Sequence, residues 1–270
     1  MRYQLDVPIL EHKQLAEFEF ELTLKSPEIA REARPGQFMQ ILYDQSYNPF
    51  TRRPFSVFHV DPDAGTFSIV YLARGVFTQG LRNKQVGQTL SVLGPLGQEY
   101  SVTTGDITHV LVAGGVGAPP LYFLAERMVE QGIPLSKIKV VNGARTQSLL
   151  VGIEEFDTLG VSVIYTTDDG SLGHQGIVTE PLEEILLEAG PENTQVYTCG
   201  PTGMLRAVGD LCVSLGAPCQ VSVETMMPCG LGVCMGCVVK IKTDKNEAGF
   251  NYLRSCFEGP VFDVHEVIWD

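Results

Sequence analysis

The sequence predicts an α/β plus β protein of three domains: an antiparallel β-barrel over residues 1–102, a parallel-sheet α/β domain over residues 103–219 and a small cysteine-rich domain over residues 220–270. Three observations predict this order. Short alternating strands fill the first hundred residues, apolar strands alternate with helices in the middle, and four of the seven cysteines lie within 28 residues near the C-terminus. A chain of 270 residues is long enough for two or three domains.

The first hundred residues are predicted to form antiparallel sheet. Apolar residues alternate with charged or polar ones over positions 17–24, so one face of that strand packs in a core and the other meets water. Further strands are expected at residues 38–42, 55–60, 67–72 and 89–93, with turn residues between them. Many short strands at this spacing are typical of a small barrel or sandwich.

The pattern changes near residue 107. A continuous apolar run at 110–113, which ends in glycines, predicts a strand buried on both faces, and residues 121–131 after it predict a helix. Similar apolar runs occur at 138–142, 161–165 and 195–198, and the last is followed by a helical stretch at 203–215. Strands that alternate with helices predict βαβ units and a parallel sheet.

The balance of charges excludes some classes of partner. The chain has 19 basic and 32 acidic residues, which gives a formal net charge of −13 and argues against nucleic acid or an anionic membrane as the main partner. No run approaches the ~20 apolar residues that a membrane span needs, and residues 1–10 lack the apolar core of a signal peptide. We therefore expect a soluble, cytoplasmic protein whose cysteines are mostly reduced.

The cysteine-rich tail has the most specific pattern in the chain. Cys229, Cys234 and Cys237 are spaced as C-x4-C-x2-C and Cys256 follows at a distance, which is the spacing of a plant-type [2Fe–2S] loop. Glycines between the ligands leave backbone N–H groups free to point at sulfur. Structural zinc is the alternative, although such sites usually present two separated C-x2-4-C pairs. The strand expected at 238–242 carries the chain away, and a hairpin at 243–249 is expected to bring it back to Cys256.

Two stretches of the first domain suit a flavin. Arg53-Pro54-Phe55-Ser56 is an R-x-x-S tetrapeptide, which by itself also fits a surface arginine before a turn. Val70-Tyr71-Leu72 is an alternating strand with an aromatic ring that could lie on a flavin, and residues 74–78 after it supply a charge, a flexible residue and a hydroxyl for a pyrophosphate.

Glycine-rich turns in the middle domain suit a dinucleotide. Gly114, Gly115 and Gly117 lie between a buried strand and a helix, where phosphates can approach the backbone and the helix N-terminus. This G-G-x-G is not the G-x-G-x-x-G fingerprint, so a plain strand-to-helix turn is the alternative. Cys199-Gly200-Pro201 repeats the arrangement at the end of another strand, and ligands bind at the carboxyl ends of parallel strands.

In this order, the R-x-x-S tetrapeptide and the two turns resemble the ferredoxin–NADP⁺ reductase superfamily. With the four cysteines added, the chain resembles the electron-transfer subunits of B-type dihydroorotate dehydrogenases from about residue 4 to residue 262. The resemblance implies FAD at Arg53, Pro54, Phe55, Ser56, Val70, Tyr71, Leu72, Gly75, Phe77 and Thr78; NAD(H) at Gly114, Gly115, Gly117, Cys199, Gly200 and Pro201; and cluster ligands Cys229, Cys234, Cys237 and Cys256. Phe77 stands where the family usually has glycine. Cys199 is expected to line the nicotinamide pocket without acting as a nucleophile, and no side chain is expected to act as a general acid or base.

The resemblance also implies a function and a partner. NADH delivers a hydride, a cluster accepts one electron at a time, and a flavin can do both. The implied partner is an FMN-containing catalytic subunit that oxidises dihydroorotate to orotate in de novo pyrimidine (UMP) biosynthesis, in a heterotetramer with two copies of each chain. No orotate site is found here, so the chain alone is not expected to oxidise dihydroorotate.

Two alternatives stay open. One is the small subunit of an electron-bifurcating NADH-dependent ferredoxin:NADP⁺ oxidoreductase or of a hydrogenase diaphorase, some of which replace a cluster cysteine with aspartate. The other is a regulatory nucleotide-binding module whose tail binds zinc. NAD(H) is expected rather than NADP(H), because a 2′-phosphate needs nearby basic residues and residues 101–220 hold only five. Asp168-Asp169-Gly170-Ser171 fits either a turn or a contact to the dinucleotide.

Overall fold

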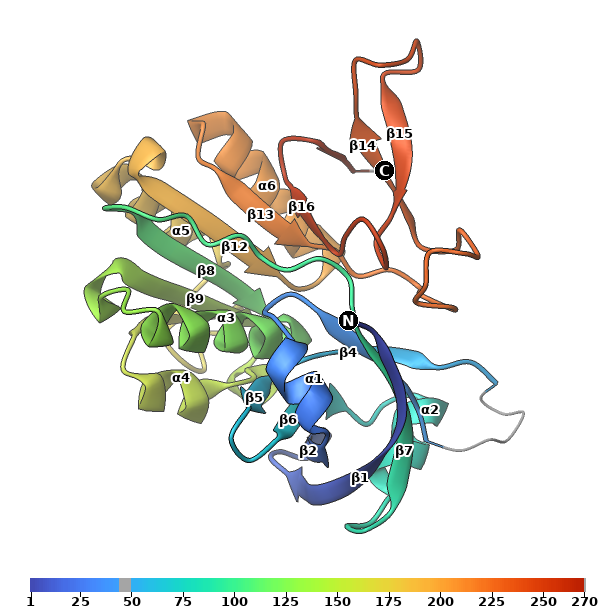
Figure 1. Ribbon diagram of the computed structural model, residues 1–270. Coiled ribbons are helices and arrows are strands. Elements are labelled where there is room, and N and C mark those ends of the chain that lie inside the picture. Colours follow the sequence, from blue (N-terminus) through green and yellow to red (C-terminus); the bar gives the residue numbers. More distant parts are fainter. Residues whose placement is uncertain (44–49, 270) are drawn as a thin grey trace.

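The computed structural model describes residues 1–43 and 50–269 and contains three sheets (Figure 1). The first sheet is antiparallel and has the strand order β4-β3-β7-β1-β2-β6-β5. Its strands are β1 (Tyr3–Gln14), β2 (Glu19–Lys25), β3 (Phe38–Leu42), β4 (Arg53–Ser56), β5 (His59–Asp61), β6 (Thr66–Leu72) and β7 (Thr89–Leu96), with helices α1 (Pro27–Glu32) and α2 (Val76–Arg82). It confirms the predicted antiparallel first domain.

The first sheet is rolled so that its two edges meet. The edge strands β4 and β5 are joined by only Val57 and Phe58, so they must lie next to each other. The backbone N–H of Val57 bonds to Gln37 O at 3.2 Å, and that of Phe58 bonds to Ser68 O at 2.9 Å. The single strand predicted at 55–60 is therefore wrong: the chain crosses there from one edge of the sheet to the other.

The sequence pattern also missed the longest strand of the sheet. β1 has no strict alternation, carries Pro8 and several charges, and shifts register between Ile9 and Glu11. Its first half pairs with β7 and its second half with β2, so β1 curves around the barrel (Figure 1). Pairing on both sides, rather than amphipathic alternation, makes this segment a strand.

The second sheet is parallel except at one edge and confirms the predicted α/β domain. Its strand order is β11-β10-β9-β8-β12-β13-β16, in which only β16 runs antiparallel. The strands are β8 (Thr108–Gly114), β9 (Ile138–Ala144), β10 (Ser162–Thr167), β11 (His174–Gln175), β12 (Thr194–Cys199), β13 (Cys219–Ser222) and β16 (Val261–Asp263). Residues of α3 (Ala118–Glu130) and α4 (Ile153–Leu159) pack on the barrel side, and those of α5 (Thr179–Ala189) and α6 (Thr202–Leu215) on the other. Short 3-10 turns are η1 (Gly115–Gly117), η2 (Leu135–Lys137), η3 (Gln147–Leu149) and η4 (Pro191–Asn193).

The third sheet is small and antiparallel, with β14 (Val238–Lys242) between β15 (Phe250–Arg254) and β17 (Val267–Ile268). The turn at 243–249 is closed by the Thr243 N–H to Gly249 O bond of 2.9 Å, which confirms the predicted hairpin. β16 and all of β13 except Cys219 come from residues 220–270, but both strands complete the second sheet. The division into 1–102, 103–219 and 220–270 stays a prediction.

The barrel and the parallel sheet are held together by α3. His59 Nδ1 on β5 lies 2.8 Å from Glu126 Oε1, and the rings of Phe58 and Tyr122 are 4.9 Å apart. Phe123 is fully buried and belongs to the barrel core. This contact fixes the carboxyl ends of the parallel strands beside the barrel. Among the described helices, none has the length and apolar character to cross a membrane.

Candidate cofactor-binding sites

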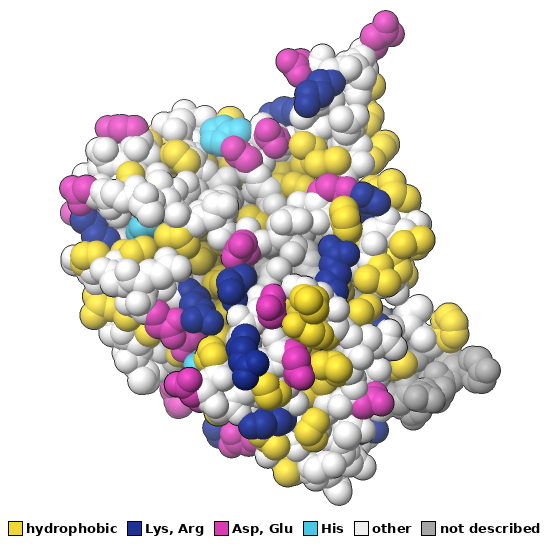
Figure 2. All heavy atoms as spheres, viewed as in Figure 1, with side chains coloured by type: hydrophobic (Ala, Val, Ile, Leu, Met, Phe, Trp, Pro, Cys, Tyr) yellow, Lys and Arg dark blue, Asp and Glu magenta, His cyan; other side chains and the backbone are white. Residues whose placement is uncertain are grey.

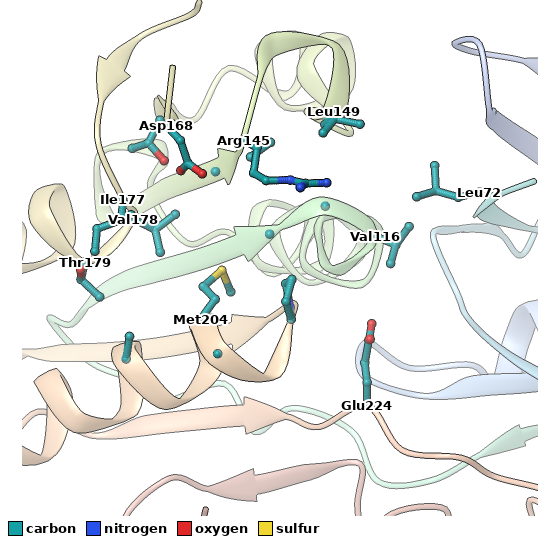
Figure 3. A pocket seen from close by; sticks show the side chains of 18 of the residues that line it. Leu72, Val116, Arg145, Leu149, Asp168, Ile177, Val178, Thr179, Met204 and Glu224 are labelled. Atoms are coloured by element: carbon teal, nitrogen blue, oxygen red, sulfur yellow. The ribbon is translucent and has the colours of Figure 1, made fainter. Parts of the chain in front are cut away.

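A cavity of about 510 Å³ lies at the carboxyl ends of β8, β9, β10 and β12. Gly114 and Gly115 form its floor after β8, and Pro201 and Met204 line it from the start of α6. Leu72 of the barrel closes one side (Figure 3). Three of the predicted nicotinamide residues therefore lie together with one predicted flavin residue, at the position where open parallel sheets bind ligands.

Gly117 and Gly200 do not line this cavity, but they let the two turns below it pack against each other. A Cβ on Gly117 would lie 2.1 Å from the carbonyl oxygen of Cys199 and 2.6 Å from the backbone nitrogen of Gly200. The backbone of the turn after β8 therefore packs directly against the backbone of the turn after β12, with no side chain between them. Glycine is needed here for close approach, not for an unusual φ, because Gly117 has φ −79°.

Polar side chains enter the large cavity from two neighbouring strands. Arg145 follows β9 and Asp168 follows β10, and Figure 3 shows both side chains directed into the cavity. Asp169 does not line it: its Oδ1 accepts the Ser171 N–H at 3.0 Å and the Ser171 hydroxyl at 2.6 Å. Asp169 thus closes the turn and Asp168 faces the cavity, and the contact of this segment to the dinucleotide stays a prediction.

A second cavity of about 260 Å³ lies between the barrel, the parallel sheet and the cysteine-rich loop. The barrel contributes Phe38, Pro54 and Ser56, and β12 contributes Cys199. Residues after β13, including Glu224, Thr225 and Met227, line the side toward the cysteines. Two predicted flavin residues and one predicted nicotinamide residue meet here.

Glu224 lines both cavities, so the two adjoin at its side chain (Figure 3). Burial raises the pKa of Glu224. Burial, and next the nearby charge of Glu224, raise the pKa of the Cys199 thiol to about 12. Cys199 is therefore a neutral thiol at physiological pH, as expected of a lining residue that is not a nucleophile. Glu224 and Met227 were not singled out in the sequence, although they follow the carboxyl end of β13, where a ligand contact is common.

Several predicted flavin residues direct their side chains into the barrel core. Phe55 and Phe77 are 9% and 4% exposed, and the Phe77 ring packs edge-on against Tyr43 at 4.9 Å. Tyr71 is 2% exposed, its hydroxyl bonds to His12 Nε2 at 2.8 Å, and its ring stacks on Phe20. The Tyr71 ring therefore faces the core and not a cavity that could hold a flavin ring.

The remaining predicted flavin residues, Arg53, Val70, Gly75 and Thr78, line neither of the two cavities. Arg53 donates to the Thr51 carbonyl at 2.9 Å, with its guanidinium over the Phe77 ring. Val70 packs on the α3 side. Gly75 precedes α2, and its N–H donates to Thr78 Oγ1 at 3.0 Å. The residue-by-residue assignment of FAD contacts stays a prediction.

The four tail cysteines form two pairs. Cys237 and Cys256 are buried with their sulfurs 3.3 Å apart. Cys229 and Cys234 make the second pair, which is linked by a hydrogen bond and lies nearer the surface. Among the described residues, no three metal-ligating side chains converge on one point. Two pairs of thiols are the ligands that a [2Fe–2S] cluster takes.

Backbone N–H groups point at these sulfurs. The N–H of Gly232 donates to Cys256 Sγ at 3.2 Å, and that of Leu231 to Cys229 Sγ at 3.4 Å. Burial of Cys229 opposes ionisation, but backbone N–H groups of neighbouring residues lower the pKa of its thiol to about 6. Burial and the adjacent Cys237 raise the pKa of Cys256 to about 12. Donors placed around thiolate ligands are what an iron–sulfur site requires, so the residues present fit a [2Fe–2S] cluster.

The chain matches two family models. Residues 224–268 match the "Iron-sulfur cluster binding domain of dihydroorotate dehydrogenase B", and residues 111–210 match the "Oxidoreductase NAD-binding domain". One similar solved structure is titled for the NADH-dependent reduced ferredoxin–NADP oxidoreductase; it is 31% identical with a TM-score of 0.82, over 97% of this chain and 90% of the other. A ferredoxin reductase of carbazole 1,9a-dioxygenase, 21% identical with a TM-score of 0.68 over 80% and 67%, shares the fold.

Two curated relatives are similar over their whole length. The "Dihydroorotate dehydrogenase B (NAD(+)), electron transfer subunit" of Caldanaerobacter subterraneus subsp. tengcongensis is 35% identical over 269 residues, which covers 100% of both chains. The protein of the same name from Bacillus mycoides is 33% identical over 270 residues, which covers 99% of this chain and 100% of the relative. The chain therefore belongs to the family of electron transfer subunits of dihydroorotate dehydrogenase B.

Proposed function

We propose that this chain is an oxidoreductase subunit that carries electrons between NAD(H) and a [2Fe–2S] cluster by way of FAD. In this role it couples the oxidation of dihydroorotate, on an FMN-containing catalytic subunit, to NAD⁺ reduction in pyrimidine biosynthesis. The observation that carries the proposal is that the two cavities adjoin at Glu224, while Thr225 and Met227 continue the wall of the smaller cavity toward Cys229. Met227 also packs in one apolar cluster with Cys237 and Cys256, which supports an order of dinucleotide, flavin and cluster regions along this side of the protein.

The residues divide the binding tasks. Around the larger cavity, the glycine turn after β8 admits phosphates, Arg145 supplies a positive charge, and Asp168 supplies a hydrogen-bond acceptor. Around the smaller one, Phe38, Pro54 and Met227 present apolar surface that excludes water. FAD, when bound there, supplies the exchange between two-electron and one-electron transfer. Cys199 stays neutral and orients its neighbours.

A visible spectrum of anaerobically purified protein tests this function. Flavin bands with broad iron–sulfur absorption are expected, and NADH should bleach both, because the dinucleotide, flavin and cluster sites adjoin. Iron, sulfide and zinc are measured on the same sample. A colourless protein that contains zinc would contradict the proposal and favour the alternative of a zinc-binding regulatory module.

The similar NADH-dependent reduced ferredoxin–NADP oxidoreductase structure supports a second candidate, a subunit of a bifurcating enzyme. The two candidates differ in the partner. Addition of an FMN-containing dihydroorotate dehydrogenase should give dihydroorotate-dependent NAD⁺ reduction in the first case and none in the second. Size-exclusion chromatography with light scattering of the same mixture measures whether two copies of each chain assemble, as we propose.

An apolar surface around the cysteines is the proposed docking face for the partner. Met226, Val233 and Met235 are 83%, 78% and 50% exposed, on either side of the cluster ligands. Figure 2 shows apolar side chains gathered below the β14–β15 hairpin, on the side that carries this loop in Figure 1. Exposed apolar groups of this kind mark interaction sites.

Val233→Asp is expected to weaken binding of the partner subunit at least about tenfold, because it places a charge in the apolar contact. The dissociation constant is measured by calorimetry with the catalytic subunit. Leu187→Asp, at a 64% exposed position on α5, is the matched control and should bind normally. If both variants bind the catalytic subunit with equal affinity, Val233 does not belong to the docking face.

Asp168 is proposed to favour NAD(H), because its carboxylate faces the ligand space and would repel a 2′-phosphate. Asp168→Asn removes this charge and leaves Arg145 in place, so the KM for NADPH should fall by about tenfold while the KM for NADH rises. Steady-state reduction of an artificial acceptor measures both. Glu183→Gln, exposed on α5, is the control. An unchanged NADPH KM in Asp168→Asn would contradict the assignment.

A further inference from the structure

Arg254 joins the two segments that carry the tail cysteines. It ends β15, two residues before Cys256, and its Nη1 donates to the carbonyl oxygen of Gly232 at 2.7 Å. Gly232 lies between Cys229 and Cys234 in the sequence. A side chain from the strand after the first three cysteines is thus bonded to the loop between the first two of them.

The orientation of this guanidinium is fixed on its other side by Glu258. Arg254 Nε donates to Glu258 Oε2 at 3.0 Å, Nη2 donates to Oε1, and the backbone N–H of Arg254 donates to Oε2 at 2.7 Å. The guanidinium also lies over the Phe257 ring, 4.8 Å from its centroid. A planar fork held by two carboxylate oxygens and one ring has little freedom to turn away from Gly232.

Gly232 connects the fixed Arg254 guanidinium to the sulfur of Cys256. Its N–H donates to Cys256 Sγ at 3.2 Å while its carbonyl accepts from Arg254. Its φ is +77°, and a Cβ there would lie 3.0 Å from Phe257 Cβ and 3.3 Å from Arg254 Nη1. Both polar backbone groups of Gly232 are therefore held, and the donor to Cys256 keeps its direction only while Arg254 stays in place.

The charge of Arg254 acts on the same sulfurs. An arginine stays protonated in proteins, and this guanidinium is bonded to Gly232, whose own N–H donates to Cys256 Sγ. One-electron reduction adds a negative charge to a cluster held by four thiolates, so a fixed cation nearby stabilises the reduced form. Hydrogen bonds and charges around the sulfurs are what set the potential of such clusters.

We propose that Arg254 is a positioning residue for the cluster: it holds the Cys229–Cys234 loop against Cys256 and raises the reduction potential of the cluster that the four cysteines bind. This inference rests on the proposed function, because it requires a cluster. It adds a residue that neither donates a ligand sulfur nor lines either cavity.

Two substitutions separate position from charge. Arg254→Gln removes both the charge and the fork, and Arg254→Lys keeps the charge but loses the two-point contact with Glu258. Arg206→Gln is the matched control, since Arg206 also has an acidic partner four residues later, Asp210, but lies on exposed α6. Bound FAD in each preparation reports whether the chain is folded.

The measurements are the rate of iron release to a chelator and the cluster midpoint potential from an EPR-monitored redox titration. Arg254→Gln should release iron at least about tenfold faster and shift the midpoint to a more negative value. Arg254→Lys should release iron faster with a midpoint close to that of the unaltered protein. Loss of all iron from Arg254→Gln with FAD retained would also support the positioning role, and Arg254→Lys then reports on charge.

Release rates and midpoints of Arg254→Gln that equal those of Arg206→Gln would overturn the inference and leave the proposed function standing. A midpoint of Arg254→Lys as negative as that of Arg254→Gln would overturn the role of the charge. If the unaltered protein itself binds no iron, the proposed function fails and this inference fails with it.

Discussion

Gly117→Ala is expected to destabilise the protein by about 3 kcal/mol or more, which lowers Tm by roughly 6 °C or more in a chain of this size. The added Cβ would lie 2.1 Å from the carbonyl oxygen of Cys199 and 2.3 Å from its carbonyl carbon. These are backbone atoms at the end of β12, so no side-chain rotation relieves the overlap. The turns after β8 and β12 must separate, and the floor of the larger cavity opens with them.

Differential scanning calorimetry measures the change in Tm, and the KM for NADH should rise in the same variant. Gly203→Ala is the stability control. Gly203 lies in α6 with no atom within 4 Å of an added Cβ, so alanine should leave the free energy of unfolding unchanged or raise it by up to about 1 kcal/mol through helix propensity. Equal melting temperatures of the two variants would contradict the close approach of the two turns.

Cys256→Ser is expected to abolish the cluster while FAD remains bound. Cys256 is 1% exposed, its sulfur lies 3.3 Å from Cys237 Sγ, and it accepts the Gly232 N–H. A serine hydroxyl ionises far less readily than a thiol, and the thiolate is the ligand. Changes outside the ligand set already cost 10- to 100-fold in metal affinity, so loss of a ligand should cost more than about 100-fold.

Iron and acid-labile sulfide per FAD measure this loss, and electron delivery to the partner subunit should disappear with the cluster while NADH still reduces FAD. Cys212→Ala serves as the control, because Cys212 is buried on α6 outside the group of four. Full iron content in Cys256→Ser would remove Cys256 from the ligand set. Loss of iron in Cys212→Ala would instead indicate a general loss of fold.

Much of the fold could be predicted because local patterns reflected local burial. The strands at 110–113 and 138–142 are buried on both faces, as their apolar runs indicated. β1 could not be predicted in this way, since pairing with two distant strands makes it a strand and its own sequence does not alternate. The crossing at Val57 and Phe58 depends likewise on which strands β4 and β5 meet, and that is settled by the closure of the barrel.

The site residues were predicted best where the spacing of cysteines or glycines along the chain indicates the ligand that they bind. The four cysteines and the two glycine turns could be found from the chain. The direction of side chains could not be predicted: Tyr71 on β6 and Phe77 on α2 belong to flavin-like motifs, but both pack in the barrel core. Asp168 could not be separated from Asp169 until the hydrogen bonds of Ser171 assigned one to the turn. Arg145, expected only as one of few basic residues, lies in the cavity itself.

The edge strand β16 has a consequence for the rate at which electrons leave the chain. β13 leads into the cysteine-rich segment and β16 brings the chain back, and the two strands pair antiparallel with Gln220 opposite Asp263 and Ser222 opposite Val261. The segment between them, which includes β14 and β15, is anchored at both ends to the same sheet, so it cannot swing as a domain on a single hinge does. Tunnelling from flavin to cluster would therefore occur across one built-in gap, and turnover should not depend on solvent viscosity.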